Sequence, residues 1–330
     1  MSAPTEVNLD LDDIQRGVLS PRPTPYAVTY LVFRIDDRAH GRELMRRLSG
    51  AVTSVADSAS PLGETWVSAA VTCAGLEALG VPRSSLDTFA WEFRQGMAAR
   101  ATALSDVGQS SPEHWEAPLG TRDVHVVITA VAPDALVLEA AVDRARPVYE
   151  RLPGITAIWR QDCYALPTGT EHFGYRDGVS HPAVEGSGIP GSNQLEVPLK
   201  AGEFVLGYPD ELGGAETPQP TVLGRNGSYA AFRKLHQQVA EFRRYLRDNA
   251  NGPQDEELIA AKIMGRWRSG APWRLPRSVT IPNSAQIRTA ATPSCTSGTT
   301  QQASPRPAAA TSAVPTRAMP RWPERYGCTA

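Results

Sequence analysis

The segment FGYRDGVSHPAVEG, residues 173–186, gathers residue types that could do chemistry. It places the carboxylate of Asp177 between two glycines and within a few residues of His172 and His181. An aspartate followed by glycine is first of all a turn signal, because the Asp side chain bonds nearby backbone and glycine tolerates positive φ. Two other roles are open for Asp177: a metal ligand together with the histidines, and an acid–base group that accepts and returns one proton.

The spacing of His172, Asp177 and His181 does not favour a metal site. His172 and Asp177 are five positions apart, a spacing that lies on one face of neither a helix nor a strand. Each histidine is by default an ordinary surface residue or a satisfied core residue. We therefore predict no metal ion held by these three side chains.

The elements that must position Asp177 begin with a regular α+β pattern. β-branched and aromatic runs predict strands over 26–35, 66–73, 124–132 and 155–166. Apolar residues at helical spacing follow the first and third strands, and Asp134 is a candidate N-cap for the second helix. The order strand, helix, strand, strand, helix, strand is the split unit of a ferredoxin-like sandwich.

An insertion over residues 74–116 interrupts this pattern and predicts short helices. Its aromatic residues Phe89, Trp91 and Phe93 are expected in the core rather than at a cofactor, because large rings are usually buried.

A second sandwich is expected to start after Asp177. The sequence predicts a Gly/Pro-rich loop over 187–194, a short strand over 203–208 and a shorter helix over 256–267. Between the last two, a helix is predicted with an apolar stripe made of Leu235, Val239, Phe242 and Leu246.

The composition changes at Arg274. Asp, Lys and Phe disappear, while Ala, Pro, Ser, Thr and Arg dominate, and such a segment cannot bury enough apolar surface to fold. We therefore predict an N-terminal ferredoxin-like domain over 1–170, the start of a second over 171–273, and a disordered tail over 274–330.

Bulk properties narrow the function classes. The chain has 330 residues and a net charge of −2, so neither nucleic acid nor an anionic membrane is an expected partner. The acidic start does not resemble a signal peptide, and no run of about 20 apolar residues occurs. The four cysteines form no CxxC motif, so a cytoplasmic location is expected.

Seven stretches of the chain, in this order, resemble the dye-decolorising peroxidases, also called DyP-type haem peroxidases. They are LDDIQRGVL, AGLEALGVP, EFRQGMAARA, GYRDGVSHPAVEG, GEFVLGY, FRKLHQQVAEFRRYL and MGRWRSGAP, between residues 11 and 272. The resemblance implies two ferredoxin-like domains, haem b as cofactor, and hydrogen peroxide and an organic reductant as partners. Among relatives it also implies homo-oligomers and encapsulin cargo.

By position in this family, Asp177 lies over the distal face of the haem and moves a proton between the two oxygens of bound hydrogen peroxide. The resemblance likewise places Gly178, Val179, Ser180 and His181 at the cofactor. His181 stands where relatives often carry glutamine, so its ring is a candidate for the distal pocket.

The proximal histidine that holds iron in this family stands in a motif close to GAHIRRANPRD, with a distal arginine further on. Past Pro272 this chain contains no histidine. The tail offers an explanation: with permitted codons for ATSAVPTRAMP, residues 310–320, a frame two bases on encodes HIRRANPRDA. We hypothesise a frameshift soon after Trp273, which makes the tail an out-of-frame translation.

Three functions therefore stay open. The first is a haem-dependent peroxidase that oxidises dyes and phenolic-type substrates. The second is a non-catalytic remnant that lacks the proximal haem ligand. The third is a ferredoxin-like binding module, since this fold hosts many unrelated functions.

Overall fold

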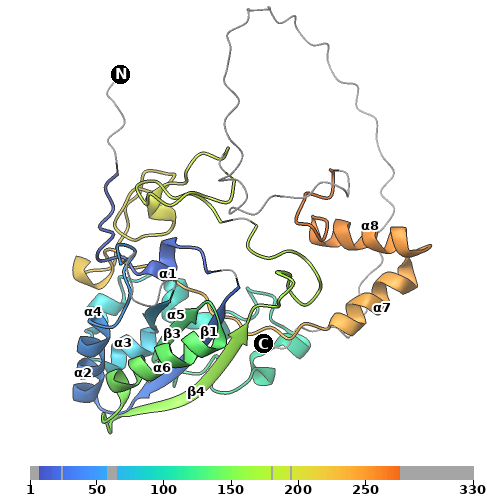
Figure 1. The fold of residues 1–330 in the computed structure, drawn as a ribbon. Coiled ribbons are helices and arrows are strands. Elements are labelled where there is room, and N and C mark those ends of the chain that lie inside the picture. Colours follow the sequence, from blue (N-terminus) through green and yellow to red (C-terminus); the bar gives the residue numbers. More distant parts are fainter. Residues whose placement is uncertain (1–6, 24, 58–64, 180, 194, 276–330) are drawn as a thin grey trace, which may run out of the picture.

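The computed structural model describes residues 7–23, 25–57, 65–179, 181–193 and 195–275 (Figure 1). Within these residues four strands form one antiparallel sheet in the order β2-β3-β1-β4. The strands are β1 Ala27–Ile35, β2 Trp66–Val71, β3 Val126–Ala132 and β4 Ile155–Tyr164. With a helix after β1 and another after β3, this is the predicted split unit, and the α+β fold class is confirmed.

The two crossover helices, α2 Arg38–Ser49 and α6 Ala135–Tyr149, lie against one face of the sheet (Figure 1). Leu44 and Leu48 of α2 share an apolar cluster with Leu31 and Phe33 of β1. A second cluster joins α6 to β1 and β3 through Ala27, Ala130, Ala132, Leu138 and Val142. The main core therefore lies between the sheet and these two helices.

The helix α6 begins as the sequence predicts. The Asp134 side chain accepts hydrogen bonds from the backbone N–H groups of Leu136 and Val137, which have no partner inside the helix. Pro147 lies within the last turn of α6. Pro147 has no N–H to donate, so the carbonyl four residues earlier loses its helical partner.

The insertion between β2 and β3 forms the expected short helices. They are α3 Cys73–Ala78, α4 Arg83–Leu86, α5 Trp91–Ala99 and the 3₁₀ turns Gly108–Ser110 and Pro112–His114. Phe89 is buried and stacks on Phe93, whose ring centroid is 5.1 Å away. Trp91 differs from the prediction: its side chain is 49% exposed, with the Arg100 guanidinium 4.6 Å from its ring centroid.

The predicted strand over 203–208 is wrong. The 3₁₀ turn Ala201–Glu203 and a tight loop replace it, and Gly202 donates a hydrogen bond to the Pro209 carbonyl at 2.9 Å. A Cβ atom on Gly202 would lie 2.3 Å from the Tyr208 carbonyl oxygen. The chain therefore closes on itself here instead of extending.

The part of the chain around this loop packs on the N-terminal segment. Leu9, Ile14 and Leu19 form one buried apolar cluster with Val184, Ala201, Val205 and Tyr208. The helix α1 Arg16–Leu19 and the 3₁₀ turn Thr221–Leu223 complete the short elements of this region. Residues near the start of the chain and residues of the predicted second domain thus share one core.

Two helices end the described chain and lie apart from the sheet: α7 Val239–Asn249 and α8 Pro253–Met264 (Figure 1). The predicted helix is confirmed from Val239 onward, but Leu235 lies before it and is 55% exposed. Residues 228–238 form no regular secondary structure; Phe232 packs edge-on against Tyr30 there, and Arg233 pairs with Asp106. These contacts override the helical pattern of the sequence.

The described part of residues 165–275 contains isolated bridges and helices but no strand. The predicted tail over 274–330 lies outside the described residues, except for its first two. The domain limits 1–170, 171–273 and 274–330 stay predictions. No described helix combines the length and the apolar character needed to cross a bilayer.

Candidate active site

Asp177 stands at the end of a closed loop, residues 169–178, that leaves the sheet after β4. An isolated bridge joins Thr170 to Arg176, and the Asp177 backbone N–H donates to the Gly169 carbonyl at 3.3 Å. The loop is thereby closed on itself just before the carboxylate. Every backbone N–H from residue 173 to residue 178 has a named acceptor.

Glu171 supplies acceptors for three of these N–H groups. Its carboxylate accepts from Phe173 N at 2.8 Å and from Tyr175 N at 2.9 Å, and its carbonyl accepts from Gly174 N at 2.8 Å. The Gln237 side chain donates to the same carboxylate at 2.8 Å. Charge-assisted bonds of this kind are about twice as strong as neutral ones, so Glu171 fixes the first half of the loop.

Arg268 fixes the second half of the loop. Its carbonyl accepts from Arg176 N at 3.0 Å, and its Nη1 donates to the Phe173 carbonyl at 2.5 Å. Its Nε donates to both carboxylate oxygens of Glu257 on α8 at 2.9 Å. Arg268 therefore ties the MGRWRSGAP stretch to the GYRDG stretch, 95 positions apart between Phe173 and Arg268.

Two glycines give the loop its shape. Gly174 has φ +92°, and a Cβ atom there would lie 2.8 Å from Nη1 of Arg268. Gly178 has φ +69°, and the space where its Cβ would stand is open. Both need the left-handed region that glycine enters without cost, but only Gly174 also makes room for Arg268.

The side chain of Tyr175, itself a residue of this loop, is buried and 1% exposed. It packs with Leu246 of α7 and Ala260 of α8, and the Arg268 guanidinium lies 5.1 Å from its ring centroid. Its hydroxyl has no hydrogen-bond partner among the described residues. Burial raises the pKa of the Tyr175 phenol above its ordinary value.

The Asp177 side chain itself is exposed at the surface of the described chain. Its Oδ1 accepts a hydrogen bond from the Gly178 backbone N–H at 2.8 Å, so the turn role expected of an Asp-Gly pair is present. Its Oδ2 has no protein partner in the described part of the chain. One oxygen is thus held while the other is free to take or give a proton.

The remaining predicted site residues do not gather around Asp177 in one pocket. His172 is exposed, and Val179 is half-buried against Gly270. The Nε2 of His181 donates to the Leu19 carbonyl at 3.1 Å, so this ring anchors the end of α1. Ser180 lies outside the described residues. Among those described, no cluster of three His, Cys, Asp or Glu side chains could hold a metal ion.

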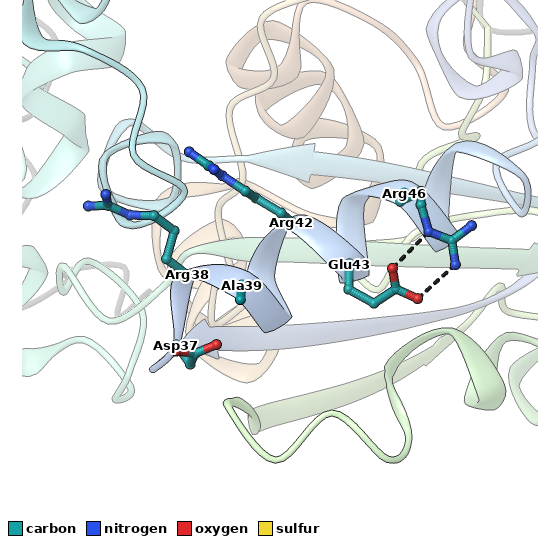
Figure 2. Close-up of a pocket in the computed structure, with 6 residues that line it drawn as sticks. All are labelled: Asp37, Arg38, Ala39, Arg42, Glu43 and Arg46. Carbon is teal, nitrogen blue, oxygen red and sulfur yellow. Dashed lines mark hydrogen bonds and ion pairs between the residues drawn. The ribbon is translucent and has the colours of Figure 1, made fainter.

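A surface hollow of about 590 Å³ lies elsewhere, over α2 (Figure 2). Its lining comes from α2 and its N-cap: Asp37, Arg38, Ala39, Arg42, Glu43 and Arg46. Arg46 and Glu43 are joined to each other there by two hydrogen bonds of 2.7 Å. The residues of the 169–178 loop contribute nothing to it.

The described residues fit only one side of a haem site. Asp177 meets the need for a carboxylate with one free oxygen on a fixed loop. All six histidines are described, and none of them has a fully buried side chain. His40 lies 2.9 Å from Asp37, His125 accepts from Ile35 N, and His181 bonds Leu19, while His114, His172 and His236 are exposed. The iron-binding side is therefore not formed by these residues.

The sequence singles out Asp177 as a candidate but does not point to Glu171, Arg268 and Tyr175, the residues that hold its loop. Tyr175 and Arg268 lie inside stretches that carry the family resemblance, GYRDG and MGRWRSGAP. Their co-occurrence was the available signal, but it does not say that the two stretches meet. That contact is visible only in the fold.

The ferredoxin-like sheet makes this chain an α+β protein, and comparisons with known proteins confirm its resemblance to the dye-decolorising peroxidases. Peroxidase 2 of Mycetinis scorodonius is 29% identical over 82% of this chain and 52% of its own length. The dye-decolorising peroxidase of Exidia glandulosa is 30% identical over 80% of this chain and 52% of its own length.

A solved structure of an ancestral D-type dye-decolorising peroxidase superposes with a TM-score of 0.67 at 29% identity. The match covers 81% of this chain and 60% of that one. No protein-family model matches the chain. The chain spans about half the length of the curated relatives it matches.

Proposed function

We propose that this chain is a haem-dependent peroxidase that uses hydrogen peroxide to oxidise dyes and phenolic-type substrates, with Asp177 as its acid–base residue. The observation that carries the proposal is the free Oδ2 of Asp177 at the end of a loop in which every backbone N–H from residue 173 to residue 178 is bonded. A general acid–base group needs such a fixed position and an oxygen available for proton exchange.

The substrate class is supported by similarity. The relatives are named peroxidases and dye-decolorising peroxidases. One solved dye-decolorising peroxidase, with a TM-score of 0.66 and 26% identity to this chain, is a complex with 2,6-dimethoxyphenol. We extend both kinds of substrate, dyes and phenols, to this chain. Its proposed partners are hydrogen peroxide and an organic reductant, and its proposed location is the cytoplasm.

Haem b, when bound, would supply the redox chemistry with peroxide. The chain contributes the carboxylate of Asp177. Its Oδ2 accepts one proton and returns it, while the Gly178 N–H holds its Oδ1 in place. The loop around Asp177 keeps this carboxylate from reorienting, which is the preorganisation that proton transfer requires. Gly178 and Val179 next to it are proposed to contact the cofactor, as are Ser180 and His181.

Hemin titration of the purified protein tests the proposal. We expect a sharp Soret band and peroxide-dependent dye bleaching, which Asp177→Asn lowers by about 10²- to 10⁴-fold, the usual contribution of a general acid–base group. Asp248→Asn is the matched control, because Asp248 is an exposed carboxylate on α7 without a described partner. Equal bleaching by Asp177→Asn and Asp248→Asn would show that Asp177 is not the acid–base residue.

A second candidate is the non-catalytic remnant, favoured by the absence of a fully buried histidine among the described residues. In this case hemin gives no specific Soret band with the wild-type chain. A colourless, soluble and well-folded protein would instead favour the third candidate, a binding module on a ferredoxin-like scaffold.

A further inference from the structure

We propose that Arg268, held by Glu257, is a positioning residue for Asp177. This inference rests on the proposed acid–base role of Asp177 and adds the side chains that set its position. Arg268 does not bond Asp177 itself. Arg268 acts through the backbone of the residues that immediately precede Asp177.

The contacts of Arg268 converge on three of those residues. Its guanidinium donates to the Phe173 carbonyl at 2.5 Å and lies 5.1 Å from the Tyr175 ring centroid, and its carbonyl accepts from Arg176 N at 3.0 Å. Asp177 therefore directly follows residues that Arg268 contacts through both its side chain and its main chain. A shift of Arg268 must move at least one of these anchors.

Glu257 sets the position of Arg268. Both carboxylate oxygens of Glu257 accept from Nε of Arg268 at 2.9 Å. The Glu257 side chain is 22% exposed and the Arg268 side chain is 35% exposed. Partial burial reduces solvent screening of this pair, and removal of one partner leaves the other charge poorly solvated. The pair thus links α8 to the loop that carries Asp177.

The sequence around Asp177 is adapted to this arrangement. A side chain at position 174 would place Cβ 2.8 Å from Nη1 of Arg268 and displace the guanidinium from the Phe173 carbonyl. Gly174 therefore serves the Arg268 contact, in addition to its backbone conformation. An arginine that only stabilised α8 would not need this space.

The test compares Arg268→Met, Arg268→Lys and Glu257→Gln with the control Lys262→Gln. Lys262 is an exposed cation on α8 without a described contact, so its loss reproduces the change of charge alone. Arg268→Met keeps the length of the side chain and removes its donors. Arg268→Lys keeps the charge but cannot bond Glu257 and Phe173 with one planar fork, so we expect a smaller effect.

The first readout needs no cofactor. In the full chain, we expect Arg268→Met to speed amide hydrogen exchange of residues 173–178 by about tenfold to a hundredfold, the equivalent of one lost charge-assisted hydrogen bond. We also expect it to shift the NMR signal of the Gly178 N–H that donates to Asp177. If both stay as in Lys262→Gln, Arg268 does not position Asp177, whatever the protein catalyses.

The second readout uses hemin-loaded protein. We expect Arg268→Met to lower the rate of peroxide reaction by about tenfold to a hundredfold, because a misplacement of about 1 Å has effects of this size, while hemin affinity stays unchanged. We expect Arg268→Lys to recover part of the rate that Arg268→Met loses. A wild-type chain that binds no hemin contradicts the proposed function, and the exchange measurement then still decides the role of Arg268.

Discussion

Replacement of Gly174 by alanine offers a quantitative test of the loop that carries Asp177. Gly174→Ala forces a side chain into φ +92° and brings Cβ within 2.8 Å of Nη1 of Arg268. The backbone strain costs about 1–2 kcal/mol. Loss of the bond from Arg268 to the Phe173 carbonyl adds about 1.5–3 kcal/mol.

Gly178→Ala is the matched control for this change. It brings the same kind of strain at φ +69°, but no atom lies within 4 Å of the new Cβ. We therefore expect a loss of about 2.5–5 kcal/mol in the free energy of unfolding for Gly174→Ala and about 1–2 kcal/mol for Gly178→Ala.

Urea unfolding followed by tryptophan fluorescence measures the difference, since Trp267 and Trp273 flank the Arg268 turn. Equal losses for the two variants would refute the reasoning, because the Arg268 contact would then contribute nothing. A loss for Gly174→Ala that falls to the strain cost of about 1–2 kcal/mol in an Arg268→Met background would identify the contact as the cause of the difference.

Three further outcomes are expected. Tyr175→Phe should raise the free energy of unfolding at pH 7 by about 1 kcal/mol, because it removes a buried hydroxyl without a described partner. Burial raises the pKa of Tyr175 in the folded protein. The stability that the neutral phenol contributes is therefore present below about pH 10 and is lost as pH rises through the folded pKa. Tyr175→Phe should abolish this loss, which urea unfolding at pH 7 and above pH 10 measures. Leu246→Ala should cost about 2–5 kcal/mol, because Leu246 is buried under the loop, whereas Leu235→Ala should change stability by less than about 0.5 kcal/mol in the same urea assay. Resequencing of the gene region after Trp273 should reveal a shift of one or two bases, and an intact frame whose codons cannot encode HIRRANPRDA would end the frameshift hypothesis.

The sheet could be predicted from the sequence because its signals are local. The β-branched run that forms β1 and the N-cap Asp134 of α6 each act within a few residues. The fold class followed from the order of these elements. Antiparallel pairing of β1 with both β3 and β4 then agrees with that order.

The errors arose where distant contacts decide the local structure. Leu235 fits a helical stripe, but the neighbouring Phe232 packs on Tyr30 and the segment forms no helix. The run over 203–208 fits a strand, but Gly202 lets the chain close against Tyr208. Neither partner can be read from the pattern around the residue itself.

The candidate site shows the same division. Asp177 and its Asp-Gly turn could be recognised from neighbouring residues, and the structure shows the bond from Gly178 N–H. The support from Arg268 could not be recognised, since 95 positions separate it from Phe173. The bond from Nε2 of His181 to the Leu19 carbonyl, 162 positions away, could likewise not be recognised from the sequence.

The central claim is that Asp177 transfers the proton in a peroxidase reaction. Stopped-flow measurement of the reaction of hydrogen peroxide with wild-type and Asp177→Asn proteins, at equal hemin occupancy, tests it most directly. We predict a rate about 10²- to 10⁴-fold lower for Asp177→Asn. Equal rates for the two proteins would contradict the account.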